Sequence, residues 1–432
     1  TVTLGRCGGT VALASGASQT GFGRTGTVDW DTTPKTGTFT AVSGVGYFVD
    51  TSSGVSTANL PAGVAGAIVS FADYTRTFQT NNLTITPNGS EKIGGVAANF
   101  VAQTEGQSIT LVYVDGTEGW INTNESTGQS GLTPAFIAAS GGTITTVCTN
   151  FKVHTFTGPG TFTVTCAGNP LGSGSVDYLV VAGGGGGGFR YGGGGGAGGF
   201  RESSGAVSGS YSASPLGACV SALPITAQAY PIVIGGGGNG GVQASATNAS
   251  NGSNSVFSTV TSAGGGRGAN CSGPTTGGSG GSGGGGKSCA PGGAGNTPPV
   301  SPPQGNSGGQ GSGVPRYGSG GGGGSGVAGT NGTPTTGGNG GNGLATSITG
   351  SSVARGGGGG GGTYYGGSPT GAGGTGGGGN SNVASGSAGT TGDAGTVNTG
   401  GGAGGGSDGT GVPYGTGGAG GSGIVIIRYK FQ

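Results

Sequence analysis

Charged side chains are scarce in this chain. Lysine, arginine, aspartate and glutamate together make up 6% of the 432 residues, whereas they make up about a quarter of ordinary soluble domains. The formal net charge is only +1, so the chain lacks the basic excess of a protein that binds nucleic acid or an anionic membrane surface. It also lacks the high charge that keeps disordered segments solvated.

Long apolar runs, histidine and methionine are missing or nearly so. The longest apolar runs, Tyr178–Ala182 and Ile424–Ile427, fall far short of the ~20 residues that span a membrane. One histidine and no methionine argue against a histidine-based metal site and a methionine-rich binding groove. We therefore predict no metal, no cofactor and no membrane insertion. Residue 1 is threonine and begins no signal-peptide pattern, so we expect it to arise by processing or to lie inside a longer chain.

Cysteines are few and scattered. The chain has six of them and none belongs to a C-x-x-C pair, which argues against a zinc site. Cys148 and Cys166 enclose a short loop, as do Cys271 and Cys289. Disulfides at these two pairs can form in an oxidising medium, and free thiols fit the sequence equally well.

Glycine is the residue present in excess. It supplies 121 residues and proline another 19, a level that usually marks low complexity or disorder. The glycine is unevenly distributed, which indicates segments of different character. We divide the chain into a connector at 1–25, a small β domain at 26–125, a linker at 126–142, a β-hairpin and the strand after it at 143–182, and a glycine-rich domain closed by a C-terminal strand at 183–432.

The segment 26–125 has the composition of a small β domain. Ser108–Val114 alternates polar and apolar residues over its first half, as a half-buried strand does. Asp115-Gly116 then predicts a hairpin. No segment of the chain has a sustained helical period, so we predict an all-β fold with almost no α-helix. The strands predicted in this domain are Thr27–Trp30, Gly46–Asp50, Ala67–Phe71, Leu83–Thr86, Ser108–Val114 and Gly119–Asn122.

Apolar strands also bracket the glycine-rich region. We predict a hairpin of Ile144–Phe156 and Thr161–Thr165, joined by a Gly-Pro-Gly turn. A strand at Val176–Ala182 runs directly into glycine, Tyr230–Ile234 interrupts the glycine, and Ile424–Tyr429 ends it. A disordered tract has no need of an apolar strand at each end. We therefore predict that these three strands can pair and that the region between them folds, in preference to a flexible tail.

Glycine can fold without a side-chain core if its backbone packs against itself. Polyproline-II-type helices have three residues per turn and no internal hydrogen bonds. Without Cβ atoms, several can lie close enough for each N–H to reach a neighbour's carbonyl, which offsets the entropy that glycine loses on ordering. Runs such as Gly192–Gly196 and Gly356–Gly362 break the G-x-y register and exclude collagen. We therefore predict a β-strand-bracketed bundle of polyglycine-II helices.

Side-chain chemistry is left to the turns between the glycine tracts. Stiff rods would gather these turns at one or both ends, and function tends to lie on loops that a rigid scaffold holds. Aromatic rings there supply a large contact area at low entropic cost, although some of them could instead seal the bundle. The candidate receptor-contact residues are Arg190, Tyr191, Arg316, Tyr317, Tyr364, Tyr365 and Tyr414.

Motifs that would indicate an enzyme have simpler explanations. Gly281–Ser288 matches the phosphate-loop pattern, but no apolar strand precedes it and the residues after it open a helix poorly. His154 lacks a convincing acid–base partner, so we assign it a structural role, and we expect Trp30 and Trp120 in the core. Solvation of strand edges explains the carboxylates between 91 and 125 better than glycoside hydrolysis does. We predict no catalytic residues and no enzyme activity.

Several stretches at the ends of the glycine region and inside it have recognisable sequences. They are His154–Thr157, Gly160–Thr165, Val176–Gly188, Asn251–Phe257 and Gly420–Tyr429. Together they resemble the glycine-rich domain of tailed-bacteriophage fibre and adhesin proteins, over about 143–432. Through stretches such as Gly106–Asp115, the upstream domain resembles modules of marine phage fibre proteins.

This resemblance implies a virion tail fibre or tip protein, located outside the cell, that binds a host cell-surface receptor. The receptor would be a glycan or an outer-membrane protein, bound by the end loops of packed glycine helices. Such loops vary freely, so no receptor residue carries over. By analogy with fibres we expect a homotrimer attached to other virion tail or fibre proteins. The alternatives are a purely structural connector or capsid-surface fibre, an extracellular bacterial surface protein, and an ice-binding protein, for which the tracts vary too much.

Overall fold

The computed structural model divides into two compact units, which we describe one at a time. The first lies within residues 1–134 and 169–171, and the second within 135–168 and 172–432. The structure describes residues 28–125, 134–169, 171–217, 219–245, 247–365 and 369–432.

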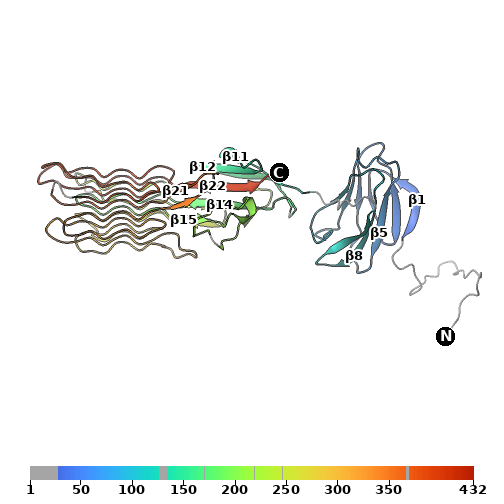
Figure 1. The fold of residues 1–432 in the computed structure, drawn as a ribbon, viewed down its shortest axis with the longest axis horizontal. Helices are drawn as coiled ribbons and strands as arrows, with labels where there is room; N and C mark the ends of the chain where they lie inside the picture. The colour runs from blue at the N-terminus through green and yellow to red at the C-terminus, as the bar shows by residue number, and fades with distance from the viewer. Residues whose placement is uncertain (1–27, 126–133, 170, 218, 246, 366–368) are drawn as a thin grey trace, which may run out of the picture. The chain divides into compact units, whose positions relative to one another are not determined.

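The first unit consists of two β-sheets (Figure 1). One has the strand order β1-β3-β5-β8-β9 and the other the order β2-β4-β6-β7. The strands of the first sheet are β1 (Asp29–Lys35), β3 (Val45–Val49), β5 (Ile68–Asp73), β8 (Ser108–Asp115) and β9 (Gly119–Glu125). Those of the second are β2 (Thr38–Thr40), β4 (Ser56–Asn59), β6 (Leu83–Thr86) and β7 (Phe100–Ala102).

The chain winds between these two sheets in a coil. From β1 to β6 successive strands alternate between the sheets, and each strand pairs in parallel with the strand two places on. Antiparallel strands β7, β8 and β9 complete the sheets. One apolar core, which includes Phe71, Phe78, Leu111 and Trp120, lies between them. The predicted hairpin after Asp115 is confirmed by the pairing of β8 with β9.

The two tryptophans differ in how far they are exposed to solvent. Trp120 is completely buried, and its indole Nε1 donates to Glu91 Oε2 at 3.2 Å. Trp30 is 43% exposed, so the expectation that it lies in the core is wrong. It belongs to β1, which has a neighbour on one side only, and its ring packs on Phe48 of β3 with the centroids 4.9 Å apart.

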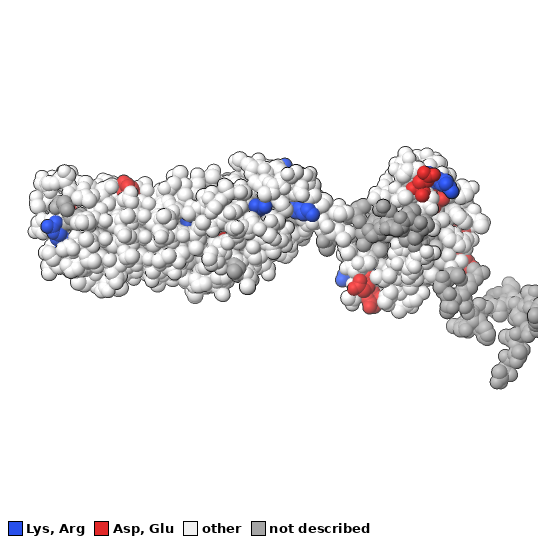
Figure 2. Space-filling model, viewed as in Figure 1, with Lys and Arg blue, Asp and Glu red and all other residues white. Residues whose placement is uncertain are grey.

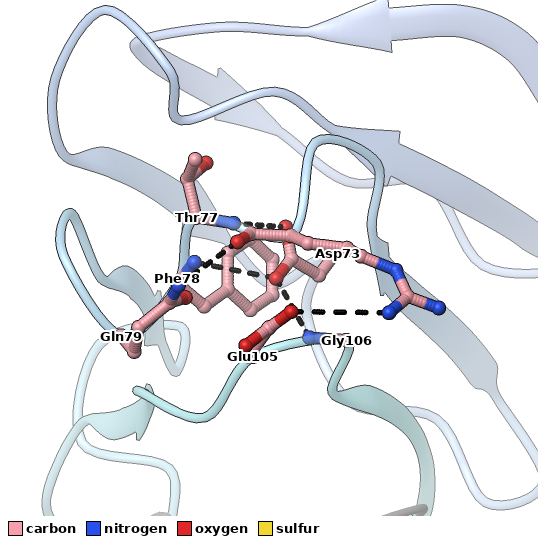
Figure 3. A network of polar contacts seen from close by, with 7 residues as sticks. Asp73, Thr77, Phe78, Gln79, Glu105 and Gly106 are labelled. Carbon is pink, nitrogen blue, oxygen red and sulfur yellow. Dashed lines mark hydrogen bonds and ion pairs between the residues drawn. The ribbon is translucent and has the colours of Figure 1, made fainter.

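Asp73, at the end of β5, joins two loops of the first unit (Figure 3). Its carboxylate accepts hydrogen bonds from the backbone N–H groups of Thr77 at 3.1 Å and Phe78 at 3.3 Å, in the loop before β6. It also accepts one from the N–H of Gly106 at 3.0 Å, in the loop before β8. Main-chain donors that a turn would otherwise leave unpaired are satisfied in this way, so one side chain fixes both loops.

The second unit combines two packed sheets with the glycine-rich bundle (Figure 1). One sheet has the order β10-β13-β17-β18-β19, with strands Ile137–Ser140, Gly160–Ala167, Ala229–Val233, Ser255–Phe257 and Val260–Ser262. The other has the order β11-β12-β22-β14-β15, with strands Thr143–Val147, Phe151–Phe156, Ile424–Lys430, Ser175–Val181 and Phe200–Glu202. The remaining elements are β16 (Leu223–Pro224), which pairs with β14, the β20–β21 ribbon (Leu344–Thr346 and Val353–Arg355) and the 3-10 turn η1 (Ala206–Ser208).

The last strand, β22, lies between β12 and β14 and is buried on both faces. Val425 and Ile427 belong to the core between the two sheets, whereas Ile424 and Ile426 belong to a second core on the opposite face. This double burial explains the continuous apolar run, because a strand covered on both sides needs no polar alternation. The predicted pairing of the first and last bracketing strands is confirmed. The third strand, β17, instead pairs with β13 and β18.

Two predictions for residues 126–182 are wrong. Ile144–Phe156 and Thr161–Thr165 do not form a hairpin with each other, because β12 and β13 lie in different sheets and the turn between them crosses the core. The hairpin is instead β11 with β12. The predicted linker contains strand β10, whose Ile137 is buried against the core. The connector predicted at 1–25 and residues 126–133 of the linker lie outside the described residues.

The glycine tracts form the predicted bundle of extended chains. In tract 183–188 the N–H groups of residues 183 and 186 donate to segment 250–253. Those of 184 and 187 donate to 418–421, and those of 185 and 188 to 193–196, at distances of 2.8 to 3.1 Å. This repeat of three residues is what a helix with three residues per turn requires, since successive N–H groups then point about a third of a turn apart.

The same tract also accepts hydrogen bonds from three further neighbours. Its carbonyl groups accept hydrogen bonds from the N–H groups of residues 238 and 241, of 265 and 268, and of 403 and 406. Three donor neighbours and three acceptor neighbours surround it with six chains. Little space remains for side chains: a Cβ atom built on Gly187 would lie 2.0 Å from the carbonyl oxygen of Gly404.

Tracts on the surface of the bundle have fewer neighbouring chains to accept their N–H groups. Asparagine side chains accept some of these hydrogen bonds instead. The side-chain Oδ1 atoms of Asn251 and Asn254 accept from the N–H groups of Arg267 and Gly264 at 2.8 and 2.9 Å. Asn339 and Asn342 do the same for Ala372 and Thr375 at 2.9 and 3.0 Å. Each pair has the spacing of one helical turn, three residues. Outer tracts therefore satisfy their donors without another chain beside them.

Alanine in place of Gly187 should destabilise the bundle, because its Cβ atom would overlap the main chain of Gly404. We expect a loss of about 2 kcal/mol or more in the free energy of unfolding, at the upper end of overpacking costs. The matched control is Gly236→Ala, since a Cβ atom there meets nothing within 4 Å, and it should change stability by less than about 0.5 kcal/mol. Chemical denaturation measures both, and equal losses would contradict main-chain packing as the source of stability.

Candidate functional site at the end of the bundle

Four aromatic turns meet at the end of the bundle away from the sheets (Figure 1). They are 189–191, 315–317, 363–365 and 412–415, each of which reverses the chain between two glycine tracts. The N–H of Arg190 donates to the carbonyl of Gly415 at 2.9 Å, and the N–H of Tyr364 donates to the carbonyl of Arg316 at 2.9 Å. Main-chain bonds therefore hold together turns that are far apart in the sequence. We call these four turns the tip loops.

Three tyrosines form the centre of the tip loops. The ring centroid of Tyr191 lies 5.9 Å from that of Tyr317 and 5.1 Å from that of Tyr364, and the last two are 6.3 Å apart. All three side chains are half-buried. Tyr365 continues the cluster outward, with its ring 4.2 Å from that of Tyr364 and 43% of its surface exposed. The inner rings therefore seal the end of the rods, while Tyr365 can contact a ligand.

An ion pair fixes the turn at 412–415. Arg190 Nε lies 2.8 Å from Asp408 Oδ2, and the Asp408 side chain is completely buried. The other carboxylate oxygen accepts from the N–H of Gly415 at 2.9 Å. The guanidinium also lies 3.9 Å from the ring centroid of Tyr414, which is 38% exposed. Because a buried carboxylate must be paired, Arg190 serves first to stabilise this turn.

A cavity of about 840 Å³ opens among the tip loops and the loop that follows residue 382. Its lining combines one cation, one exposed aromatic ring and several small or apolar groups, a mixture suited to a ligand that has both polar and apolar faces. The lining residues are Pro315, Arg316, Tyr365, Val383, Ala384, Ser385, Gly386 and Thr410.

Lys287, the lysine of the phosphate-loop pattern, also lies at this end. Its side chain is 1% exposed, and Nζ lies 3.4 Å from the ring centroid of Tyr191. The preceding tract, 281–286, is a rod of the bundle, with Gly285 N–H donating to the carbonyl of Gly194 at 2.8 Å. Neither a buried strand nor a helix flanks it, so the residues do not form a phosphate loop. Burial lowers the pKa of Lys287 to about 8.

The structure places all seven candidate contact residues at the tip, but in different roles. Tyr365, Tyr414 and Arg316 line the cavity or the exposed surface, whereas Arg190 and the three inner tyrosines make internal contacts. Sequence reasoning missed Asp408 and the cavity-lining segment 383–386, and it considered Lys287 only as part of the phosphate-loop pattern. Exposed valines in the turns are also new: Val314, Val383 and Val412 are 67%, 47% and 68% exposed.

Other candidates from the sequence make internal hydrogen bonds. His154 is completely buried, with Nδ1 2.7 Å from the carbonyl of Gly141 and Nε2 3.0 Å from the hydroxyl of Tyr429. Burial lowers its pKa, in keeping with a structural role. Glu91 accepts from the N–H of Gly63 at 2.7 Å as well as from Trp120.

The disulfides considered from the sequence are not formed. Cys148, Cys166, Cys271 and Cys289 are free thiols, as is Cys219. Cys148 lies in the turn between β11 and β12, and Cys166 lies in β13 of the other sheet. Cys271 instead donates from Sγ to the hydroxyl of Tyr191 at 3.3 Å.

The comparison with protein families agrees with this architecture. A family model described as a glycine-rich domain matches residues 155–430. The chain belongs to this glycine-rich domain family. The matched range starts within β12, ends with β22 and contains every tip loop. No curated protein matches the chain.

Charged residues are sparse along the glycine bundle on the face that Figure 2 shows. Few lysine, arginine, aspartate or glutamate residues lie there between a basic patch at the tip and the charged residues near the sheets. Among the described residues, none forms a helix long and apolar enough to cross a membrane. The side-chain chemistry of the domain is thus concentrated at its ends.

Lys287 should make stability depend on pH. The unfolded chain keeps its lysine proton up to the ordinary pKa of 10.5, whereas the folded protein releases it near a pKa of about 8. The unfolded state therefore holds more protons between these values, and stability rises with pH across that window. The free energy of unfolding of the wild type, minus that of Lys287→Met, should increase from pH 8 to pH 10. A difference that is flat with pH in denaturation experiments would contradict burial of the charge.

Proposed function

We propose that this protein is a virion tail fibre or tip adhesin of a bacteriophage that binds a receptor on the host cell surface through its tip loops. The observation that carries the proposal is the cavity at the bundle end, lined by Arg316 and the exposed ring of Tyr365. Binding sites commonly lie on loops that a rigid scaffold holds in place. The motifs that resemble phage fibre proteins add to this support.

The chemistry of the tip favours a host surface as the partner. Exposed tyrosines provide a flat apolar face for sugars or for apolar side chains, and Arg316 provides hydrogen-bond donors for acidic or hydroxyl groups. The receptor would accordingly be a glycan or an outer-membrane protein. The face of the bundle that Figure 2 shows has few charged residues for a partner to recognise, so we assign recognition to the tip.

The remaining parts of the proposal concern assembly. We propose that the chain forms a homotrimer and attaches to other virion tail or fibre proteins, which places it on the particle outside the cell. Most soluble oligomers are homo-oligomers with closed point-group symmetry. Proteomic analysis of purified particles should find this chain, and its absence from them would exclude the virion assignment.

Replacing Tyr365 with alanine should weaken binding to host cells at least tenfold, equivalent to about 1.4 kcal/mol, because the ring supplies exposed contact area at the cavity. The measurement uses the labelled full-length chain on a panel of bacterial strains, starting with those that bind the wild type. Tyr74→Ala is the matched control, since this tyrosine is 56% exposed but belongs to the first unit. It should leave binding unchanged.

Two results would reject recognition by the tip. One is that the Tyr365→Ala variant binds as well as the wild type, whereas a chain that lacks the first unit does not bind. This result would assign recognition to the first unit. The other is the absence of binding to every strain that the particle itself adsorbs to, which would favour the purely structural connector.

A further inference from the structure

At the tip, a lysine and a cysteine from two different turns contact the same tyrosine side chain. Cys271 follows the tract 264–269, and Lys287 ends the tract 281–286. Cys271 Sγ lies 3.3 Å from the hydroxyl of Tyr191, and Lys287 Nζ lies 3.4 Å from the centroid of the same ring. Each of the two side chains is also among the groups that shift the pKa of the other. Nothing in the proposed adhesion requires this arrangement.

The surroundings of Lys287 favour a neutral amine. The side chain is 1% exposed, and besides Cys271 the charged groups that influence its pKa are Arg190 and Asp408. The Asp408 carboxylate is already paired with Arg190 at 2.8 Å. Because burial lowers the pKa of Lys287 to about 8, a share of the amine is unprotonated and nucleophilic near neutral pH.

The surroundings of Cys271 favour a reactive thiolate. Burial by itself raises the pKa of the thiol, but hydrogen bonds with Lys287 and Tyr191 outweigh it, so the net shift of the pKa is downward. The residue is partly exposed, which admits a small oxidant. An accessible thiolate whose pKa is lowered by neighbouring groups is the form that peroxides oxidise first.

We propose that Lys287 and Cys271 form an oxidant-dependent covalent cross-link between Nζ and Sγ. The thiolate of Cys271 attacks hydrogen peroxide, which forms an S–O bond, breaks the O–O bond and releases hydroxide that becomes water. The neutral amine of Lys287 then attacks the sulfur, so that an N–S bond forms and the S–O bond breaks. The hydroxyl leaves with a proton of the amine as a second water. In total, amine, thiol and one peroxide give a sulfenamide and two waters.

This bond would tie two turns together at the tip. It joins the turn after residue 269 to the turn after residue 286 and encloses the ring of Tyr191 next to the tip loops. The cross-link would fix that ring covalently when the particle meets an oxidising environment. Thiols would reverse it, as they do other sulfenyl derivatives of cysteine.

Peptide mapping of the folded full-length chain can test the cross-link. After exposure to hydrogen peroxide, the protein is denatured, alkylated without reductant and digested with trypsin. The unmodified chain is cut after Arg267, Lys287 and Arg316, giving peptides 268–287 and 288–316. A sulfenamide at Lys287 blocks the middle cut. We expect one peptide, 268–316, lighter than the intact sequence by two hydrogen atoms, with fragment ions that join Cys271 to Lys287.

Two variants serve as controls for this experiment. Cys289→Ser removes the exposed neighbouring thiol and should keep the uncut peptide. Lys287→Arg keeps the trypsin site and the positive charge but should lose the uncut peptide. Normal cleavage after Lys287 with only sulfinic or sulfonic acid at Cys271 would overturn the proposal. Recovery of the two separate peptides joined by a Cys271–Cys289 disulfide would overturn it as well.

Discussion

The hydrogen bond between main chains of neighbouring glycine tracts is the interaction on which the second unit depends. In tract 183–188 every N–H reaches a carbonyl of another tract, so the backbone groups that make glycine costly to order also hold the ordered state together. The chains can approach this closely only because Cβ atoms are missing. The interior of the bundle is therefore built mainly of backbone, with small residues such as Ala197, Ser282 and Ala403 buried among the glycines.

This interior has consequences for the distribution of chemistry. A rod made of backbone carries few side chains, so the flank is nearly uncharged and the functional groups lie in the turns. The sheets organise one end: β22 is the last strand of the chain, yet it lies between β12 and β14 and so brings the end of the glycine region back to its beginning. At the opposite end Tyr191 contacts rings from other turns, including that of Tyr364, which lies 173 residues further along the sequence.

Sequence reasoning was most successful where local patterns have one physical meaning. The strands Val176–Ala182 and Ile424–Tyr429 were predicted to pair because apolar strands at both ends of a glycine region can hold its ends together, and β14 does pair with β22. It failed where partners were chosen by the tertiary structure. The Gly-Pro-Gly turn after Phe156 was predicted to close a hairpin, but the chain crosses there to the facing sheet. In the first unit β2, β4 and β7 were missed, because strands of three or four residues leave little periodicity to detect.

The candidate site shows the same division. The sequence by itself determined that glycine would form the rods, that tyrosine and arginine would lie in the turns, and that charge would be rare, because these follow from the composition and from where the glycine tracts are interrupted. Only the tertiary structure decided which turns meet, which tyrosines are buried, and that Asp408 pairs with Arg190 over a separation of 218 residues. Those outcomes depend on how long each rod is and which neighbours surround it, and runs of identical glycines contain no information about either.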